Sequence, residues 1–314
     1  MIRKPEFDIM KGILIVLVVI GHTSIRLPYI DLFWFHMPTF FMITGYLSQR
    51  WVSFNDTAYL RHKAFQLLVP YLSYSIVLFL FIGYSPLWKY MLKVFLGGTL
   101  NITPFSYPFW YVNTLLVALV AFGLIKQLTQ SLQLLLIASL YLIVHLMTYW
   151  DFHPPVPWGI DNAMGALVFI YIGDKFKVYK TQKWHYSLLC APVLFTFINK
   201  LGGGVNYRIN MASIEYNHLI LDLLVPCIFA FAIYLLCMYL KKWKYITYFF
   251  SVLGHSSLTI YFTHAALFAS LLYVLAPLIG QPIAVACCLI AGALFQHIFT
   301  RFNITRTLFL GNMK

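Results

Sequence analysis

Apolar residues run along this chain in long, nearly unbroken segments, separated by short stretches that hold most of the polar and charged residues. An α-helix needs about 20 residues to cross the roughly 30 Å hydrocarbon core of a bilayer, where it satisfies its own backbone hydrogen bonds. The pattern therefore predicts an all-α fold, a polytopic bundle of about ten transmembrane helices. The predicted spans are 9–26, 31–49, 65–83, 108–125, 131–149, 160–174, 185–200, 218–240, 256–275 and 282–300.

The region 84–107 departs from this pattern. In its stretch "PLWKYMLKVFLGG", Lys89 and Lys93 are four residues apart and stand beside Trp and Phe. This mixture is typical of an amphipathic helix that lies in the membrane interface. We expect this region to rest on the surface and not to cross the bilayer.

The composition excludes a soluble globular protein, because 61% of the residues are hydrophobic, 10% are charged and the mean hydropathy is +0.79. No polar stretch is long enough for a second domain, so we expect residues 1–314 to form a single integral membrane domain without a fused soluble one. The first apolar segment contains Asp8 and Lys11 and lacks a small-x-small cleavage pattern. It is therefore predicted to be a retained span and not a cleaved signal peptide.

Basic residues give the chain a net charge of +13, but their distribution argues against nucleic-acid binding. With the N-terminus placed inside, 17 of the 22 lysines and arginines fall on one side of the predicted membrane. Such an asymmetry marks the cytoplasmic loops, so both termini are predicted to be cytoplasmic in a multi-pass protein of the cell membrane. The five basic residues on the other side are Arg26, Lys89, Lys93, Lys200 and Arg208.

The five cysteines all lie within apolar spans and lack paired metal-ligand spacing. They are typical of small buried side chains, and we expect neither a disulfide nor a metal site. These residues are Cys190, Cys227, Cys237, Cys287 and Cys288.

The first span carries three ionisable residues on one helical stripe. Lys11 precedes His22 by three helical turns, about 16 Å along the axis, and Asp8 lies close to the same stripe. Asp8 and Lys11 could form an interfacial ion pair. His22 is expected past the bilayer midpoint, where a polar side chain usually faces a cavity and marks function, although a hydrogen-bonded packing residue is the alternative.

The second span, "DLFWFHMPTFFMITGYL", places His36 at a depth similar to that of His22. The two histidines are therefore expected to face each other. Pro38 removes a backbone donor, an irregularity tolerated at membrane depth mainly beside a protein-lined cavity. Gly45 would permit close helix packing.

These residues resemble the opening of acyltransferase family 3, a family of integral membrane proteins. "DIMKGILIVLVVIGH" and "FWFHMPTFFMITGYL" are the specific segments, and "PFWYVNTLLV", "NYRINMASIEYNHLILDLLVP" and "LGHSSLTIYFTHAAL" are weaker ones. The resemblance covers essentially the whole chain. Many members have Arg at the position of Lys11, which keeps the charge but has a planar fork that lysine lacks. Some members also carry an esterase-like domain at the C-terminus, which is absent from this sequence.

The resemblance implies transfer of an acyl group, usually acetyl, from acetyl-CoA to a hydroxyl of a cell-envelope polysaccharide or lipid-linked sugar. The acyl-CoA is a co-substrate, and no tightly bound cofactor is expected. Lys11 is expected to bind the anionic part of CoA near the cytoplasmic face. His22 is the predicted general base, because burial favours its neutral imidazole. His36 would orient the acceptor or donate to the oxyanion, and a covalent acyl-imidazole on His22 is the other route.

Asp8 and further polar residues are candidates for the pocket or the acceptor site. Trp110 and Asn113 fall in the fourth span, although Trp110 could be an interfacial anchor. Tyr261 and His264 share a helical face with Ser257, and a network between helices would explain them equally well. The outer loop contributes Arg208 and Glu215 as possible sugar contacts. The residues Asp161, Asn162 and Asp222 have the same ambiguity.

A transporter or flippase of glycan precursors is the alternative function, because it too needs buried polar residues. A structural membrane subunit would not explain two buried histidines near one depth. Acetyl-CoA consumption would separate an enzyme from a transporter. The sequence leaves open the sugar, its hydroxyl, the acyl chain length and the oligomeric state.

Overall fold

The computed structural model describes residues 4–27, 30–48, 57–83, 85–101, 103, 105–176, 187–201, 207–270 and 277–312. These residues are mostly helical, which confirms the all-α fold. The helices are α1 (Pro5–Gly21), α2 (His36–Leu47), α3 (Thr57–Ile82), α4 (Leu87–Leu96), α5 (Trp110–Ile125), α6 (Gln130–Tyr149), α7 (Ile160–Lys175), α8 (Cys190–Leu201), α9 (Leu221–Leu240), α10 (Lys244–His255), α11 (Ser257–Ala269), α13 (Gln281–Arg301) and α14 (Asn303–Leu310).

Short 3₁₀ turns and one small hairpin connect these helices. The turns are η1 (Leu32–Trp34), η2 (Gly98–Asn101), η3 (Tyr107–Phe109) and η4 (Pro157–Gly159). Strands β1 (Ile209–Asn210) and β2 (Glu215–Tyr216) pair antiparallel, with Ile209 opposite Tyr216.

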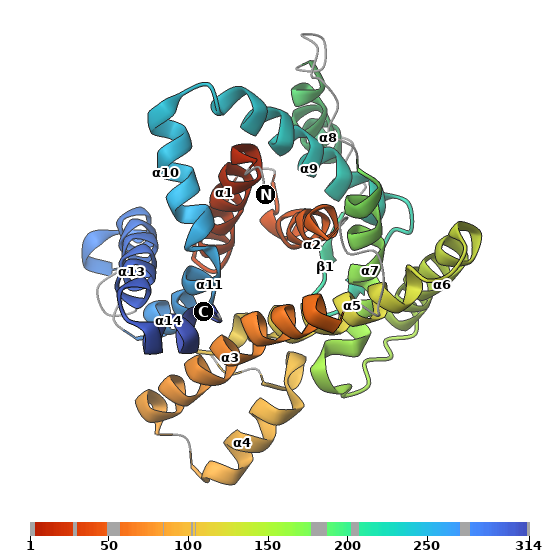
Figure 1. The fold of residues 1–314 in the computed structure, drawn as a ribbon. Coiled ribbons are helices and arrows are strands. Elements are labelled where there is room, and N and C mark those ends of the chain that lie inside the picture. The colour runs from red at the N-terminus through yellow and green to blue at the C-terminus, as the bar shows by residue number, and fades with distance from the viewer. Residues whose placement is uncertain are drawn as a thin grey trace.

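Helices α1 and α2 lie near the centre of the molecule, and the other helices surround them (Figure 1). The outer helices α3, α6 and α13 expose large apolar side chains such as Leu80, Leu135 and Ile290, as helices facing lipid do. In contrast, the central helix α1 buries Ile9, Leu14 and other residues along its length. The polar candidates on α1 and α2 are thereby shielded from lipid.

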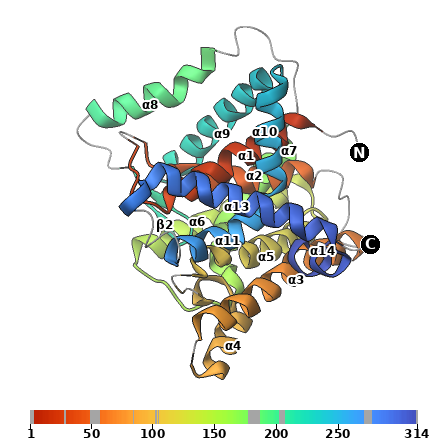
Figure 2. The ribbon, with the colours of Figure 1, turned by 90° about the vertical axis from the view of Figure 1, so that its left-hand side faces the viewer.

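Four helices of the described chain are long and apolar enough to cross a membrane: Ala58–Ile82, Gln130–Tyr149, Leu221–Leu240 and Gln281–Arg301. Helices α5, α8 and α11 are apolar but shorter. Helix α2, with 12 residues, extends only about 18 Å. The count of ten spans and the cytoplasmic termini therefore stay predictions. The start of α1 and helix α14 do lie toward one side of the molecule, as two termini on one face require (Figure 2).

The first two predicted spans are shorter in the structure. Helix α1 ends at Gly21, so residues 22–26 are not helical, and His22 follows the helix end instead of lying within a span. The second span is interrupted at Phe35, which separates η1 from α2. Pro38 consequently lies in the first turn of α2, where its missing N–H has no intrahelical partner to lose. It begins a helix and does not kink one.

Helix α10 is absent from the predicted spans, because its 12 residues are too few to cross a bilayer. It packs tightly along α1 through glycines on both helices. Gly12 lies against the backbone of Phe250, and Gly254 lies against the backbone of Asp8, so a Cβ at either glycine would overlap the opposite chain. The chain then breaks at Ser256 before α11.

Helices α2 and α7 are joined by a second pair of glycines. Gly45 faces the carbonyl of Ile170, and Gly173 faces the carbonyl of Met42, with no room for a side chain at either glycine. The close packing predicted at Gly45 is confirmed.

Helix α4 occupies the predicted interfacial region and lies at the edge of the molecule (Figure 1). It buries Tyr90 and Val94 and exposes Trp88, Phe95 and other apolar side chains. Its placement on the membrane surface stays a prediction.

Candidate active site

Side chains along one face of α1 line two pockets. Lys11 and Ile15 line the first, and Val18 and His22 line the second. These four residues recur at intervals of three or four positions, the spacing that places side chains on one helical face. The predicted stripe from Lys11 to His22 is therefore present. Tyr261 lines both pockets and forms the boundary that they share.

His22 lies at the C-terminal end of α1, where the chain turns toward η1. The centroid of its ring is 5.1 Å from that of His264 and 6.1 Å from that of Phe33, which it meets edge-on. His36 lines the same small cavity as His22. The structure thus brings all three candidate histidines together, although they come from three separate segments of the chain.

His36 begins α2 and is 2% exposed. Its Nδ1 atom contacts the carbonyl oxygen of Leu32, one turn earlier in the chain. A carbonyl can only accept, so Nδ1 of the neutral ring donates its proton there, and Nε2 presents a lone pair. Neutral His36 can therefore accept at Nε2. The oxyanion-donor role predicted for it would require the protonated ring.

His264 is held in the same tautomer and is fully buried. Its Nδ1 lies 3.1 Å from the carbonyl oxygen of Ile260 and 2.9 Å from that of Tyr261, so it donates to the backbone. The Nε2 atom has no hydrogen-bond partner among the described residues. Since a buried acceptor without a partner is costly, this nitrogen is suited to accept from a neighbouring N–H group or a substrate.

The cavity beside His22 and His36, called here the reaction pocket, has a volume of about 20 Å³. That is close to the space needed for one water molecule. Trp110 from α5, Tyr261 from α11 and Asn210 from the hairpin also line it. The hydroxyl of Tyr261 donates to the carbonyl of Pro108, which fixes the ring between the two pockets.

The pocket on the Lys11 side, called here the donor pocket, has a volume of about 180 Å³. Lys63 of α3 lines it together with Lys11, so two cations from different helices border one space. Lys63 Nζ also donates to Gln66 Oε1 at 3.0 Å. Aromatic and hydroxyl side chains complete the lining, including Tyr111 and Ser257.

A third space, called here the outer pocket, lies beyond the reaction pocket. It has a volume of about 500 Å³, and Phe33 and Asn210 line both it and the reaction pocket. Its polar lining includes Arg26, Asp31 and Arg208. Two walls are thus shared along the series: Tyr261 between the donor and reaction pockets, and Phe33 with Asn210 between the reaction and outer pockets.

The hairpin that closes the outer side is fastened by buried side chains. Asn162 Nδ2 donates to the carbonyl oxygens of Met211 and Ala212 at 2.6 and 3.3 Å, and both of these residues line the reaction pocket. The indole N–H of Trp34 donates to the carbonyl of Tyr207 at 3.0 Å. Asn162 therefore shapes the reaction pocket indirectly, by fixing the backbone of Met211 and Ala212.

Asp222 fastens the end of the same loop. Its Oδ2 accepts from the backbone N–H of His218 at 2.9 Å and lies 3.2 Å from Nε2 of His145. Asp161, also ambiguous in sequence, accepts from the backbone N–H of Asn162 at 2.8 Å. These contacts hold local structure, and neither carboxylate lines the three pockets in series.

Besides His264, which adjoins His22 without lining these pockets, three predicted residues lie outside them. Asp8 faces α10, where its Oδ2 is 3.7 Å from His255 Nε2. Asn113 accepts from the backbone N–H of Gly98 at 3.2 Å and thus supports the turn after α4. Glu215 pairs with Arg208, with Oε2 2.9 Å from Nε. Arg208 itself lines the outer pocket, whereas Glu215 does not and only pairs with Arg208.

Sequence reasoning missed Lys63, Phe33 and Asn210. Lys63 was assigned to a cytoplasmic loop because the third span was started at residue 65, whereas α3 begins at Thr57. An apolar pattern extended one turn backward would have put Lys63 on the helix. The roles of Phe33 and Asn210 depend on how η1 meets β1, and neither short element has a sequence signature.

Buried histidines between a cationic pocket and a polar pocket mark the candidate functional site of this helical protein. Sequence comparison gives the chemistry: the acyltransferase family 3 profile, described as "Acyltransferase domain", matches residues 4–296. The chain belongs to this family. Among the described residues, no group of three histidine, cysteine or carboxylate side chains could hold a metal ion.

Nodulation protein NolL of Mesorhizobium japonicum is 42% identical over 83 residues, in a region that covers 22% of this chain and 22% of that protein. The chain therefore spans only 22% of the length of this curated relative. No solved structure matches the chain.

Proposed function

We propose that this protein transfers an acetyl group from cytoplasmic acetyl-CoA to a hydroxyl of a cell-envelope sugar. The observation that carries the proposal is the series of three pockets. The reaction pocket, with His22 and His36, lies between the donor pocket, with its two lysines, and the polar outer pocket. A donor and an acceptor that approach from opposite sides would meet at the histidines.

Lys11 and Lys63 suit the phosphate groups of CoA. Two ammonium groups at one pocket attract an anion strongly, and hydrogen bonds to charged partners are stronger than neutral ones. From there the stripe of Ile15 and Val18 on α1 offers an apolar path toward His22. The pantetheine arm would follow that path past Tyr261.

The size of the reaction pocket supports a short acyl group. A volume of about 20 Å³, close to that of one water molecule, is smaller than any acyl group, so the thioester must displace side chains to enter, and each added carbon would displace more. Overfilling a packed interior typically costs about 1–3 kcal/mol. Acetyl therefore fits the proposal better than succinyl or a longer chain.

In the proposed reaction, His22 removes the proton from the acceptor hydroxyl as its oxygen attacks the thioester carbonyl. The new C–O bond produces a tetrahedral oxyanion, for which Trp110 and Asn210 are the side chains in the pocket, besides the histidines, that carry N–H groups. When the C–S bond breaks, the CoA thiolate takes the proton from His22. The acyl-histidine route would use the same residue, with the imidazole as nucleophile.

The other two histidines suit accepting roles. Neutral His22 has one N–H, and Nε2 of His264 is the adjacent buried acceptor. That hydrogen bond would leave the second nitrogen of His22 as the base, so His264 would be a positioning residue. His36 Nε2 could accept from a second hydroxyl and orient the sugar. Arg26, Asp31 and Arg208 would contact it in the outer pocket.

The donor assignment predicts a specific kinetic change. Lys11→Ala should raise the KM for acetyl-CoA roughly tenfold or more, because it removes a charge-assisted contact, while the acceptor KM stays near normal. Lys63→Ala should act in the same direction, and Lys11→Arg should largely preserve function. Lys242→Ala removes a cation outside the donor pocket and serves as the control. An unchanged acetyl-CoA KM in Lys11→Ala, with only lower protein yield, would assign Lys11 to a structural contact with its surroundings.

The whole proposal is tested in sealed inside-out vesicles supplied with envelope glycan. Acetyl-CoA added to the exposed cytoplasmic face should release CoA, and acetylated glycan should accumulate in the lumen. Translocation of glycan without CoA release would instead favour the transporter or flippase. Product found only outside the vesicles would overturn the sidedness while leaving the chemistry in place.

A further inference from the structure

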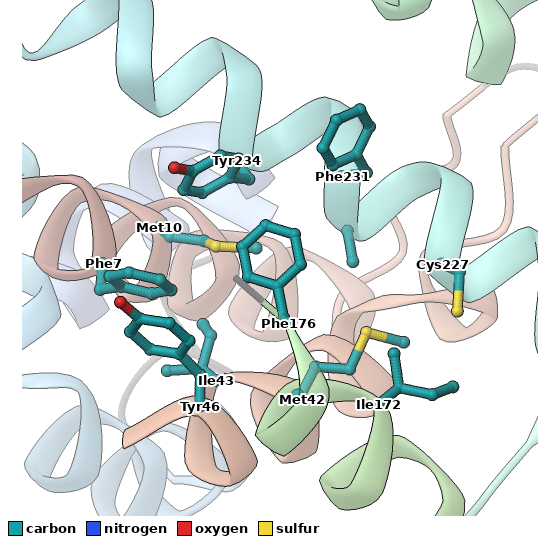
Figure 3. Close-up of a pocket in the computed structure, with 12 residues that line it drawn as sticks. Phe7, Met10, Met42, Ile43, Tyr46, Ile172, Phe176, Cys227, Phe231 and Tyr234 are labelled. Atoms are coloured by element: carbon teal, nitrogen blue, oxygen red, sulfur yellow. The ribbon is translucent and has the colours of Figure 1, made fainter. Parts of the chain in front are cut away.

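A fourth pocket lies between helices α1, α2, α7 and α9, away from the histidines (Figure 3). Its volume is about 190 Å³, and aromatic rings and sulfur-containing side chains from all four helices converge on it. Its lining is almost entirely apolar and includes Phe7, Met10, Met42, Phe176, Cys227 and Phe231. Ile43 lines both this pocket and the donor pocket, but none of the side chains that the proposed reaction uses lines this one, so it suits a different ligand.

The pocket lies at one end of the helices that form it. Phe7 belongs to the first turn of α1, whereas Tyr46 and Phe176 lie at the C-terminal ends of α2 and α7. Lys4 stands beside this end. Its Nζ donates to the Tyr46 hydroxyl and lies 4.9 Å from the centroid of that ring. Both contacts are with the neutral side chain of Tyr46, so neither compensates the charge of Lys4.

We propose that this pocket binds a segment of one hydrocarbon chain of an anionic phospholipid, with the phosphate held near Lys4. Apolar cavities of about 150 Å³ take up small apolar molecules, and methionine-rich walls adapt to flexible ones. Basic sites between membrane helices on the cytoplasmic side bind anionic lipid head groups. The combination of an apolar interior and a cation beside it fits a lipid better than the polar parts of CoA or a sugar.

Such a lipid would connect α9 to the centre of the molecule. Helices α2 and α7 are already locked together by Gly45 and Gly173, and Gly173 itself lines the pocket. From α9, Ala230 and Phe231 form the opposite wall. A chain between the two walls would fill space that the side chains leave, so lipid binding should stabilise the folded protein.

Thermal unfolding of the purified protein in dodecyl maltoside tests this proposal. Added dioleoylphosphatidylglycerol should raise Tm by roughly 3–6 °C, as expected for a ligand at about tenfold over its Kd. Dioleoylphosphatidylcholine should raise it less. Cys227→Phe fills the pocket and should lose most of the increase, whereas Cys287→Phe makes the same change at an exposed site on α13 and should keep it.

Native mass spectrometry gives the second measurement. Wild type and Cys287→Phe should retain one phosphatidylglycerol that Cys227→Phe lacks, and Ala230→Leu replaces Cys227→Phe if that variant does not fold. Lys4→Gln should reduce the preference for phosphatidylglycerol over phosphatidylcholine, while Lys242→Gln, another lysine over a tyrosine ring, should not. A full Tm increase and retained lipid in the filled variants would overturn the chain site. Equal effects of the two lipids on wild type would overturn the anionic head group.

Discussion

Replacing His22 with alanine should reduce acyl transfer by about a hundredfold or more while the protein accumulates in the membrane at its normal level. General-base action alone contributes roughly a hundredfold to ten-thousandfold, and His22 is the imidazole placed between the other two histidines. The loss of packing should be small, because His22 lies beyond the end of α1. The measurement is single-turnover transfer from radiolabelled acetyl-CoA to glycan, together with Tm.

His297→Ala is the matched control, since this histidine is exposed on α13 and its Nε2 lies 2.9 Å from Arg301. It should leave turnover unchanged. Near-normal turnover in His22→Ala would show that His22 is a packing residue and not the general base. His36→Ala should also be severe, because it removes the Nε2 acceptor at the same cavity.

Much of the fold could be predicted because each span repeats one strong signal, a long apolar segment that must be helical in lipid. Helix ends were harder to predict. The end of α1 at Gly21 precedes the polar stretch His22–Ser24, which a span drawn to residue 26 passes over, whereas the break at Phe35 lies inside apolar sequence. Helix α10 was missed for another reason: its 12 residues are too few for a span, although it packs on α1 through Gly12 and Gly254.

The candidate site was predictable where its residues share one helix. Lys11 and His22 are joined by helical periodicity, and the depth argument placed His36 near His22. Residues that meet only through tertiary packing gave no such signal. Lys63 reaches the donor pocket from α3, and Asn210 reaches the reaction pocket because Asn162 and Trp34 hold the hairpin against it. The tautomers of His36 and His264 likewise follow from carbonyl contacts that only the folded chain reveals.

The tautomer of His264 leads to the second large effect. His264→Asn should lower kcat roughly tenfold to a hundredfold, the usual cost of losing a residue that orients a reactive imidazole. An asparagine amide can still donate to the carbonyls of Ile260 and Tyr261, but it is too short to replace the Nε2 acceptor that faces His22. The KM for acetyl-CoA should change little, since His264 does not line the donor pocket.

His264→Gln makes the complementary change. Its longer side chain can place an amide oxygen near the former Nε2 position, while it gives up the donor to the backbone carbonyls. If His264 positions His22, the Gln variant should recover a large part of the kcat that the Asn variant loses, even if its Tm is the lower of the two. If His264 only maintains the structure of α11, the order reverses, and activity should follow Tm with the Asn variant ahead. Measuring kcat, both KM values and Tm for the two variants therefore separates a positioning residue from a packing residue.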